Sequence, residues 1–303
     1  MKPQARQSLL TTEGMSRSEV ESLFARARLH ARGLESGRSV RALEGKVVAN
    51  LFFEASTRTR LSFERAAKAL GADVLNLTAQ TSSVVKGETL LDTVRNVEAM
   101  GVAALVIRHA ASGAALLASR HVRCAVVNAG DGTHAHPSQA LLDAFMLHER
   151  WGSLEGKRVA IVGDVLHSRV ARSNLFCLTT LGAQVVFSGP PTLMPAGLEQ
   201  LGGRVAPSLE VALAEADAVM VLRVQGERQN AGYVPSVREY ARMYGLTAER
   251  AARLRPDVLV MHPGPVNRGV ELAPEVADGP ANVILAQVSH GVAVRMAILE
   301  ACV

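Results

Sequence analysis

Short apolar stretches alternate with amphipathic stretches along almost the whole chain, and this alternation constrains the fold more than any other feature. We predict strands at 46–53, 73–77, 102–108, 122–130, 158–164, 183–189, 218–223 and 257–263. We predict helices at 16–32, from about 57 to 71, and at 88–101, 137–150, 168–182 and 288–303. Strands and helices that alternate in this way are typical of parallel sheets covered by helices on both faces. The sequence therefore predicts an α/β fold with doubly wound parallel sheets.

The strand–helix pattern restarts near the middle of the chain, which indicates two domains. A polar turn, "WGSLEGKR", follows the helix expected at 137–150, and a new strand begins directly after it. A chain of 303 residues is long enough for two domains with a core in each. We expect a first domain at 1–150 and a second at 151–285, with the last helix, at about 286–303, packing back on the first domain.

Charge and composition disfavour several classes of protein. The chain has 33 basic and 28 acidic residues, and the basic residues are scattered, so we expect no nucleic-acid partner. The three cysteines form no CxxC pair, which indicates neither a disulfide framework nor a cysteine-rich metal site. The N-terminus lacks a long apolar segment, and we see no apolar run of membrane-spanning length. We therefore expect a cytoplasmic protein with no membrane partner.

The stretch "FFEASTRTRLSFERAAKALG" carries an unusual set of polar residues where a strand gives way to a helix. Ser56, Thr57 and Thr59 supply three hydroxyl groups, and Arg58 and Arg60 supply two guanidinium groups. A helix N-terminus offers unpaired backbone N–H groups and the positive end of the helix dipole, and a guanidinium suits phosphate. One serine here would indicate only an N-cap, whereas the whole cluster predicts an oxyanion site, most readily for phosphate.

Other polar residues also follow predicted strands, and ligands of such sheets bind outside the carboxyl ends of the strands. The first half contributes Arg108 in "VIRHA", and His136 and Gln139 in "GDGTHAHPSQALLD". The second half contributes Arg169 and Arg223. Because an arginine can hold a carboxylate through two hydrogen bonds, two arginines suit a dicarboxylate. The residues predict a site where a dicarboxylate meets a phosphate-bearing partner.

Several common site motifs are missing from the sequence. "SSVVKGET" is not a phosphate-binding P-loop, and "VGDVLHSR" lacks the glycines of a dinucleotide site. His134 and His136 form a His-x-His pair without the further ligands that zinc requires, and we interpret His134 as a loop histidine. GxSxG is also absent. We therefore expect no metal and no cofactor, and catalysis by positioning and charge stabilisation without a covalent intermediate.

The chain resembles the catalytic chains of the aspartate carbamoyltransferase family, within the aspartate/ornithine carbamoyltransferase superfamily. The matching strings occur in order over nearly the whole length: "STRTRLSFE", "KGETLLDT", "VIRH", "HPSQALLD", "VGDVLHSR", "RVQGER", "HPGPVNRGVE" and "GVAVRMAIL". The resemblance implies that carbamoyl phosphate and L-aspartate react to give N-carbamoyl-L-aspartate and phosphate, in pyrimidine synthesis.

The resemblance also implies a role for each matching residue of the first half. The phosphate is expected to be held by Ser56, Thr57, Arg58 and Thr59. Thr59, Arg108 and His136 are expected to polarise the carbamoyl carbonyl, with His136 acting as a neutral hydrogen-bond donor and not as a base. Gln139 is expected to orient the carbamoyl NH2 group. Arg58, Arg108 and Lys86 are expected to stabilise charge on the leaving phosphate.

In the second half the matching residues imply an aspartate site. Arg169, Arg223 and Gln225 are expected to hold the aspartate carboxylates. Pro263 and Gly264 are expected to present backbone carbonyl groups toward the aspartate amine.

Ser82 and Lys86 match residues that, in this family, reach into the site of a neighbouring subunit. The resemblance therefore implies a homotrimer with shared active sites, and it raises a regulatory chain or a dihydroorotase as further partners.

Two other functions remain open on the sequence. A carbamoyltransferase for another amine such as ornithine shares the phosphate motif, but that family resembles "HCLP" where this chain has His262, Pro263, Gly264 and Pro265. Arg223 also favours an acidic second substrate over a cationic one. A non-catalytic pseudoenzyme scaffold is the other alternative, and the complete donor set disfavours it.

Overall fold

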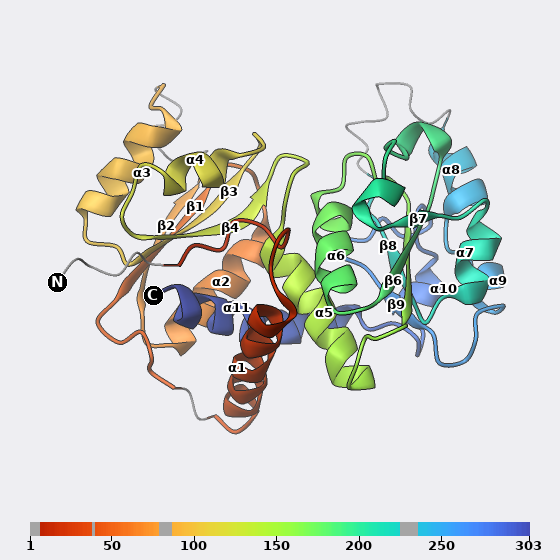
Figure 1. Ribbon diagram of the computed structural model, residues 1–303, viewed down its shortest axis with the longest axis horizontal. Helices are drawn as coiled ribbons and strands as arrows, with labels where there is room; N and C mark the ends of the chain where they lie inside the picture. The colour runs from red at the N-terminus through yellow and green to blue at the C-terminus, as the bar shows by residue number, and fades with distance from the viewer. Residues whose placement is uncertain (1–6, 38–39, 79–86, 225–235) are drawn as a thin grey trace. The chain divides into compact units, whose positions relative to one another are not determined.

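The computed structural model describes residues 7–37, 40–78, 87–224 and 236–303. The chain forms two compact units, one made of residues 1–145 and 289–303 and the other of residues 146–288. Both units are α/β structures built on a parallel sheet, as the sequence predicts (Figure 1).

The first unit is built on a four-stranded parallel sheet. Its strands lie in the order β2-β1-β3-β4, with bounds β1 Val47–Phe52, β2 Asp73–Thr78, β3 Ala104–His109 and β4 Ala125–Asp131. Its helices are α1 Arg17–Glu35, α2 Thr57–Ala69, α3 Leu90–Ala99 and α4 Ala114–Ser119, joined by parts of α5 Pro137–Trp151 and α11 Ile284–Cys302. Because β1, β3 and β4 are neighbours and parallel, the three segments that follow them leave the sheet at the same edge.

Each face of this sheet is covered by helices. On one face Leu51 and Leu105 pack in one apolar cluster with Val94 of α3 and Ala115 of α4. Helix α2 contacts β1 and β2, and α2 and α11 lie on the opposite face (Figure 1). The expected return of the C-terminal helix to the first domain is confirmed, since Ala293, Ala297 and Leu299 are buried there together with their neighbours on α11.

The second unit is built on a five-stranded parallel sheet. Its strands lie in the order β7-β6-β5-β8-β9, with bounds β5 Arg158–Val162, β6 Gln184–Ser188, β7 Arg204–Val205, β8 Ala218–Val221 and β9 Leu259–Met261. Its helices include α6 Arg169–Thr180, α7 Leu209–Glu215, α8 Val237–Tyr244, α9 Ala248–Ala251 and α10 Pro274–Ala277. Helices α7, α9 and α10 lie on one face and α6 on the other (Figure 1).

Helix α1 begins where the sequence predicts and ends later. Ser16 is its N-cap: its hydroxyl accepts a hydrogen bond from the backbone of Glu19, whose side chain accepts from the backbone of Ser16. The prediction that the helix ends at Arg32 is wrong. The helix continues to Glu35, and the left-handed glycine conformation occurs at Gly37, with φ of 68°.

Helix α11 corrects the expectation that no apolar run reaches membrane-spanning length. It has 19 residues, and an 18-residue window within it has a mean hydropathy of 1.2, so by length and composition alone it could cross a membrane. Half of that window is buried inside the structure, and Arg295 lies in it. The apolar composition of α11 is thus accounted for by packing in the core of the first unit.

Candidate active site

The predicted oxyanion cluster lies at the first turn of α2, directly after β1. The first helical hydrogen bond runs from the Arg60 N–H to the Ser56 carbonyl, so the N–H groups of residues 57–59 precede the helical ladder. Ser56 is the N-cap by position, but within the described chain its hydroxyl makes no capping hydrogen bond. Thr59 is buried and Arg58 is exposed. The interpretation of Ser56 as a simple N-cap is therefore disfavoured, and the turn has the donors that an anion requires.

Arg108 lies next to this turn because β1 and β3 are paired. Phe52 is the register partner of Arg108, and the N–H of Phe53 donates to the Arg108 carbonyl over 2.9 Å. The Arg108 side chain is only 12% exposed; its Nη2 donates to Glu54 Oε1 at 2.5 Å and its Nη1 to the Ala129 carbonyl at 3.3 Å. Arg108 is therefore fixed at the carboxyl end of β3 by groups that follow β1 and belong to β4.

The loop that carries His136 is organised by Asp131 at the end of β4. The buried Asp131 carboxylate accepts hydrogen bonds from the N–H of Gly113 at 2.6 Å, from Asn128 Nδ2 at 2.8 Å and from the N–H of Ala135 at 3.1 Å. His134 also binds Asp131, with its Nδ1 3.2 Å from Oδ2, which agrees with its interpretation as a loop residue. These bonds fix the chain immediately before His136.

His136 and Gln139 are both buried at the N-terminal end of α5. The backbone carbonyl of His136 accepts from the N–H of Gln139 at 3.0 Å, and Ser138 Oγ lies 3.4 Å from His136 Nδ1. The Gln139 Nε2 donates to Asp143 Oδ1 at 2.9 Å, one helical turn further along. The structure thus brings α2, β3 and α5 to one edge of one sheet with the predicted side chains.

Arg169 is the first residue of α6, which follows β5 in the second unit. The loop before it is held by Asp164, whose Oδ1 accepts from the backbone N–H of His167 at 3.1 Å and lies 3.0 Å from its Nδ1. Ser168 caps the helix by accepting from the N–H of Ala171 at 3.1 Å. Both contacts fix the backbone that positions Arg169.

Arg223 and the Pro263–Gly264 turn follow the neighbouring strands β8 and β9. The two segments are tied together because Asn267 Nδ2 donates to the Val224 carbonyl at 2.7 Å. The Arg223 Nε is buried and has no hydrogen-bond partner among the residues that the structure describes. An unsatisfied buried donor on a charged group is costly, and an anionic ligand would satisfy it.

The second unit therefore gathers Arg169, Arg223, Pro263 and Gly264 at the carboxyl ends of three adjacent strands, β5, β8 and β9. Three predicted site residues, Ser82, Lys86 and Gln225, lie outside the described residues.

The sequence analysis missed the acidic groups that support these residues. Asp131 and Glu54 organise the first unit's site, and Glu271 accepts from the backbone N–H of Asn267 at 2.6 Å in the second. Their signal in the sequence is a polar residue within or beside an apolar stretch.

Burial raises the pKa of Tyr240 well above its ordinary value, and the nearby carboxylates of Glu271 and Asp164 raise it further, so this phenol stays protonated.

Comparison with known families agrees with candidate site residues at the carboxyl ends of the strands in each unit. The carbamoyl-phosphate-binding domain of aspartate/ornithine carbamoyltransferases matches residues 7–149, and the Asp/Orn-binding domain of the same enzymes matches residues 155–302. The chain belongs to the aspartate/ornithine carbamoyltransferase family.

Individual members of this carbamoyltransferase family match over nearly the whole chain. An aspartate carbamoyltransferase catalytic subunit from Myxococcus xanthus (strain DK1622) is 65% identical over 294 residues, which cover 97% of this chain and 98% of the relative. A crystal structure of aspartate transcarbamoylase from Trypanosoma cruzi, in complex with carbamoyl phosphate and aspartate, superposes with a TM-score of 0.90 at 31% identity, covering 98% and 97% of the two chains. Ornithine carbamoyltransferase from Pyrococcus furiosus superposes with a TM-score of 0.86 at 28% identity, covering 97% and 96%.

Proposed function

We propose that this chain transfers the carbamoyl group of carbamoyl phosphate to the α-amine of L-aspartate, giving N-carbamoyl-L-aspartate and phosphate. The observation that carries the proposal is the 65% identity, over almost the full length of both chains, to a catalytic subunit of aspartate carbamoyltransferase. The name of that relative supports a place in pyrimidine biosynthesis. Catalysis in the cytoplasm is part of the same proposal.

In the proposed reaction the neutral α-amine of aspartate attacks the carbamoyl carbon. A C–N bond forms, the bond between that carbon and the bridging phosphate oxygen breaks, and the electron pair leaves with the phosphate. The amine nitrogen then loses one proton. Negative charge grows on the carbonyl oxygen and on the leaving phosphate, so catalysis requires hydrogen-bond donors at both positions.

The first unit supplies donors for both charges. The phosphate binds the first turn of α2 through Ser56, Thr57, Arg58 and Thr59, a role supported by the N–H groups that precede the helical ladder there. Thr59, Arg108 and His136 donate to the carbonyl oxygen, a role supported by the adjacent ends of β1, β3 and β4. Losing one such donor typically costs roughly a hundredfold or more in rate.

His136 acts as a neutral donor in this proposal and not as a base. Replacing it with glutamine should lower the rate by a similar factor across the whole pH range. A histidine-like inflection in the pH–rate profile of the wild type that disappears in His136→Gln would contradict this role.

The second unit binds aspartate in the proposed reaction. Arg169 and Arg223 hold the two carboxylates together with Gln225, while the carbonyl groups of Pro263 and Gly264 accept from the amine. The partnerless Arg223 Nε supports this assignment, because a carboxylate would satisfy a donor that the described residues leave unpaired.

The chain acts as a homotrimer in the proposal, with Ser82 and Lys86 completing the site of a neighbouring subunit. Lys86 would add a positive charge beside the leaving phosphate. Because the site would then depend on two copies, mixing an inactive Lys86→Ala chain with an inactive Arg108→Met chain should restore part of the activity.

Carbamoyl transfer to ornithine is a second candidate, since an ornithine carbamoyltransferase has nearly the same fold. The fold alone therefore does not determine which amine is carbamoylated. That specificity depends on Arg223 and on the loop after β9. The test is to incubate the protein with carbamoyl phosphate and either amine and to quantify the products. N-carbamoyl-L-aspartate should form and citrulline should not; citrulline as the only product would overturn the proposal.

A further inference from the structure

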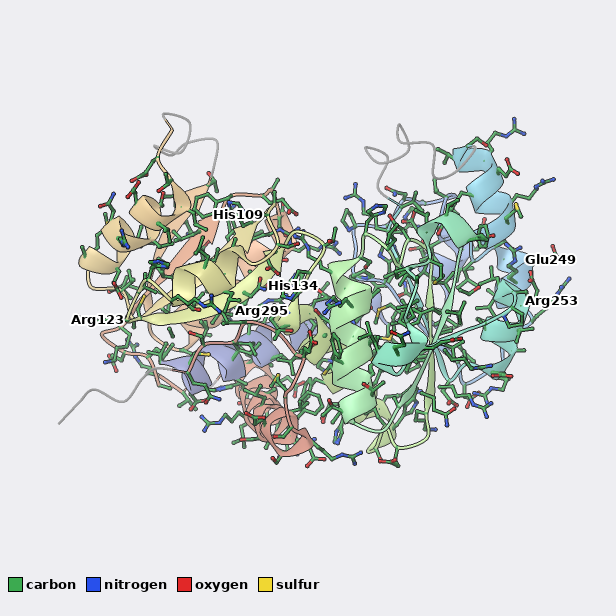
Figure 2. All side chains as sticks on the ribbon, turned by 45° about the horizontal axis from the view of Figure 1, so that its top comes forward. His109, Arg123, His134, Glu249, Arg253 and Arg295 are labelled. Carbon is green, nitrogen blue, oxygen red and sulfur yellow. The ribbon has the colours of Figure 1, made fainter. Side chains whose placement is uncertain are left out.

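A row of buried polar side chains lies behind Gln139 in the first unit. Gln139 is 8% exposed and Asp143 is fully buried, and the two are joined by the hydrogen bond from Gln139 Nε2 to Asp143 Oδ1 at 2.9 Å. They are four residues apart on α5 and therefore lie on the same face of the helix. Arg295 of α11, labelled in Figure 2, is also buried, with 4% of its surface exposed.

Arg295 is held in place by contacts on several sides. Its guanidinium carbon lies 5.1 Å from the centre of the Phe63 ring, and its Nη1 donates to the Gly291 carbonyl at 3.0 Å. Gly291 leaves room for this arrangement, because a Cβ atom there would lie 2.6 Å from Nη1. Burial lowers the pKa of Arg295 to about 10, and the negative charge of Asp143 opposes the shift. Arg295 therefore remains a cation at neutral pH.

The hydrogen bond to Asp143 fixes which end of the Gln139 amide faces that residue. The NH2 group of Gln139 donates to Asp143 Oδ1 at 2.9 Å, and a carboxyl oxygen accepts. The carbonyl oxygen Oε1 of Gln139 therefore lies on the other side of the amide and faces away from Asp143.

We propose that Asp143 is a positioning residue that fixes the amide of Gln139 with Oε1 as the group presented to the donor substrate. An oxygen in that place accepts a hydrogen bond from the carbamoyl NH2 group. The Oε1 atom would repel a substrate group that only accepts hydrogen bonds, and it would form no hydrogen bond with a methyl group. Asp143 thereby sets the preference for a carbamoyl donor over other acyl phosphates, an inference that rests on the proposed function.

Acetyl phosphate is the matched probe, since it carries a methyl group where carbamoyl phosphate carries NH2. The measured quantity is the ratio of kcat/KM for carbamoyl phosphate to that for acetyl phosphate, with aspartate as the acceptor. Effects on phosphate binding, including any change in the field of Arg295 at the nearby Arg58, act on both donors and cancel in the ratio.

The decisive variant is Asp143→Asn, which keeps the shape and lets the Gln139 amide bind in either orientation. We expect the ratio to fall by about ten- to a hundredfold, the effect of losing one buried hydrogen bond. Gln139→Ala should lower the ratio by a similar factor. Adding Asp143→Asn to Gln139→Ala should cause no further fall, because Asp143 acts through Gln139.

Two further variants separate this effect from a loss of structure. Glu300→Ala removes another contact of α11, the 2.8 Å contact between His30 Nε2 and Glu300, and should leave the ratio unchanged. Asp143→Ala removes the acceptor of the Gln139 hydrogen bond altogether and should also lower the ratio; it decides the question if Asp143→Asn does not fold. An unchanged ratio in folded Asp143→Asn or, failing that, in Asp143→Ala would overturn the inference. A wild-type protein that carbamoylates no aspartate would overturn the proposed function instead.

Discussion

The Nε2 atom of His262 lies 3.2 Å from Oε1 of Glu271, and both side chains are fully buried. The other ring nitrogen, Nδ1, accepts a hydrogen bond from the backbone N–H of Gly264 at 2.7 Å. Since Nδ1 accepts, the ring proton is on Nε2, and a neutral imidazole donates to Glu271. One histidine thus ties the Pro263–Gly264 turn to the carboxylate that also binds the N–H of Asn267.

Replacing His262 with phenylalanine should destabilise the protein. The N–H of Gly264 would lose its acceptor and Glu271 would lose a donor in a place that water does not reach, at a cost of about 2–4 kcal/mol. Urea unfolding followed by circular dichroism measures the loss. The control is His148→Phe at a partly exposed position on α5, where we expect less than about 1 kcal/mol. Equal losses in the two variants would contradict a structural role for the His262–Glu271 contact.

Arg58 and Arg60 differ by two positions on α2 but should differ strongly in function. Arg58→Met removes a charge from the proposed phosphate site and should lower kcat by roughly a hundredfold or more. Arg60 lies 3.9 Å from Glu64 in a surface pair, so Arg60→Met should cost less than about 1 kcal/mol of stability and little activity. Steady-state kinetics on both variants provides the comparison. Arg60→Met as the more damaging change would exclude the assignment of Arg58.

Arg223→Lys should weaken aspartate binding and leave the carbamoyl phosphate site intact. A lysine keeps the charge but loses the planar fork, and the loss of charge-assisted hydrogen bonds should raise KM for aspartate by about ten- to a hundredfold. Binding of carbamoyl phosphate, measured by calorimetry, should not change. Arg253→Lys is the control, because that exposed guanidinium pairs only weakly with Glu249 on the surface (Figure 2). A normal KM in Arg223→Lys would remove Arg223 from the aspartate site.

The Asp217 carboxylate should make the free energy of unfolding decrease as the solution becomes acidic. Burial raises its pKa, but hydrogen bonds from the Arg158 N–H at 2.8 Å and from Arg255 Nη2 at 2.7 Å outweigh burial and hold the pKa below its ordinary value. The ionised group therefore stabilises the fold above the unfolded-state pKa of about 4, and this contribution is lost as the pH falls through the lower folded-state pKa.

At pH 7 we expect Asp217→Asn to be less stable than the wild type by about 1–2 kcal/mol, a gap that closes in acid. Urea unfolding at several pH values measures it. Asp257→Asn is the matched control, because the Asp257 side chain is 75% exposed and lies 3.9 Å from the same Arg255. A gap for Asp217→Asn that stays constant down to pH 2 would show that this carboxylate does not titrate as expected.

The fold and the residues that would touch substrate could be predicted because their signals are local. Apolar stretches of strand length mark β1 and β5, and Ser56 to Thr59 stand at a strand-to-helix junction where such residues are needed for an anion. The short helices α4, α7, α8, α9 and α10 and the strand β7 were not predicted, since elements of two to eight residues carry too little periodicity to recognise.

The supporting residues could not be predicted because they act through long-range contacts. Asp143 and Arg295 are 152 positions apart, and each is a charged residue between apolar neighbours in its helix that could equally have faced water. Only the packing of α5 against α11, where Phe145 and His290 meet with ring centres 5.4 Å apart, brings the pair into one core. Glu54 and Arg108 likewise meet only because β1 and β3 are paired.

The most direct test of the proposed reaction is a crystal structure with N-(phosphonacetyl)-L-aspartate, which joins mimics of both substrates in one molecule. We expect its phosphonate to accept hydrogen bonds from the first turn of α2 and from Arg108, and its two carboxylates to bind Arg169 and Arg223. A complex in which the phosphonate lies away from Ser56 to Thr59, or in which neither arginine of the second unit contacts a carboxylate, would contradict the proposed reaction.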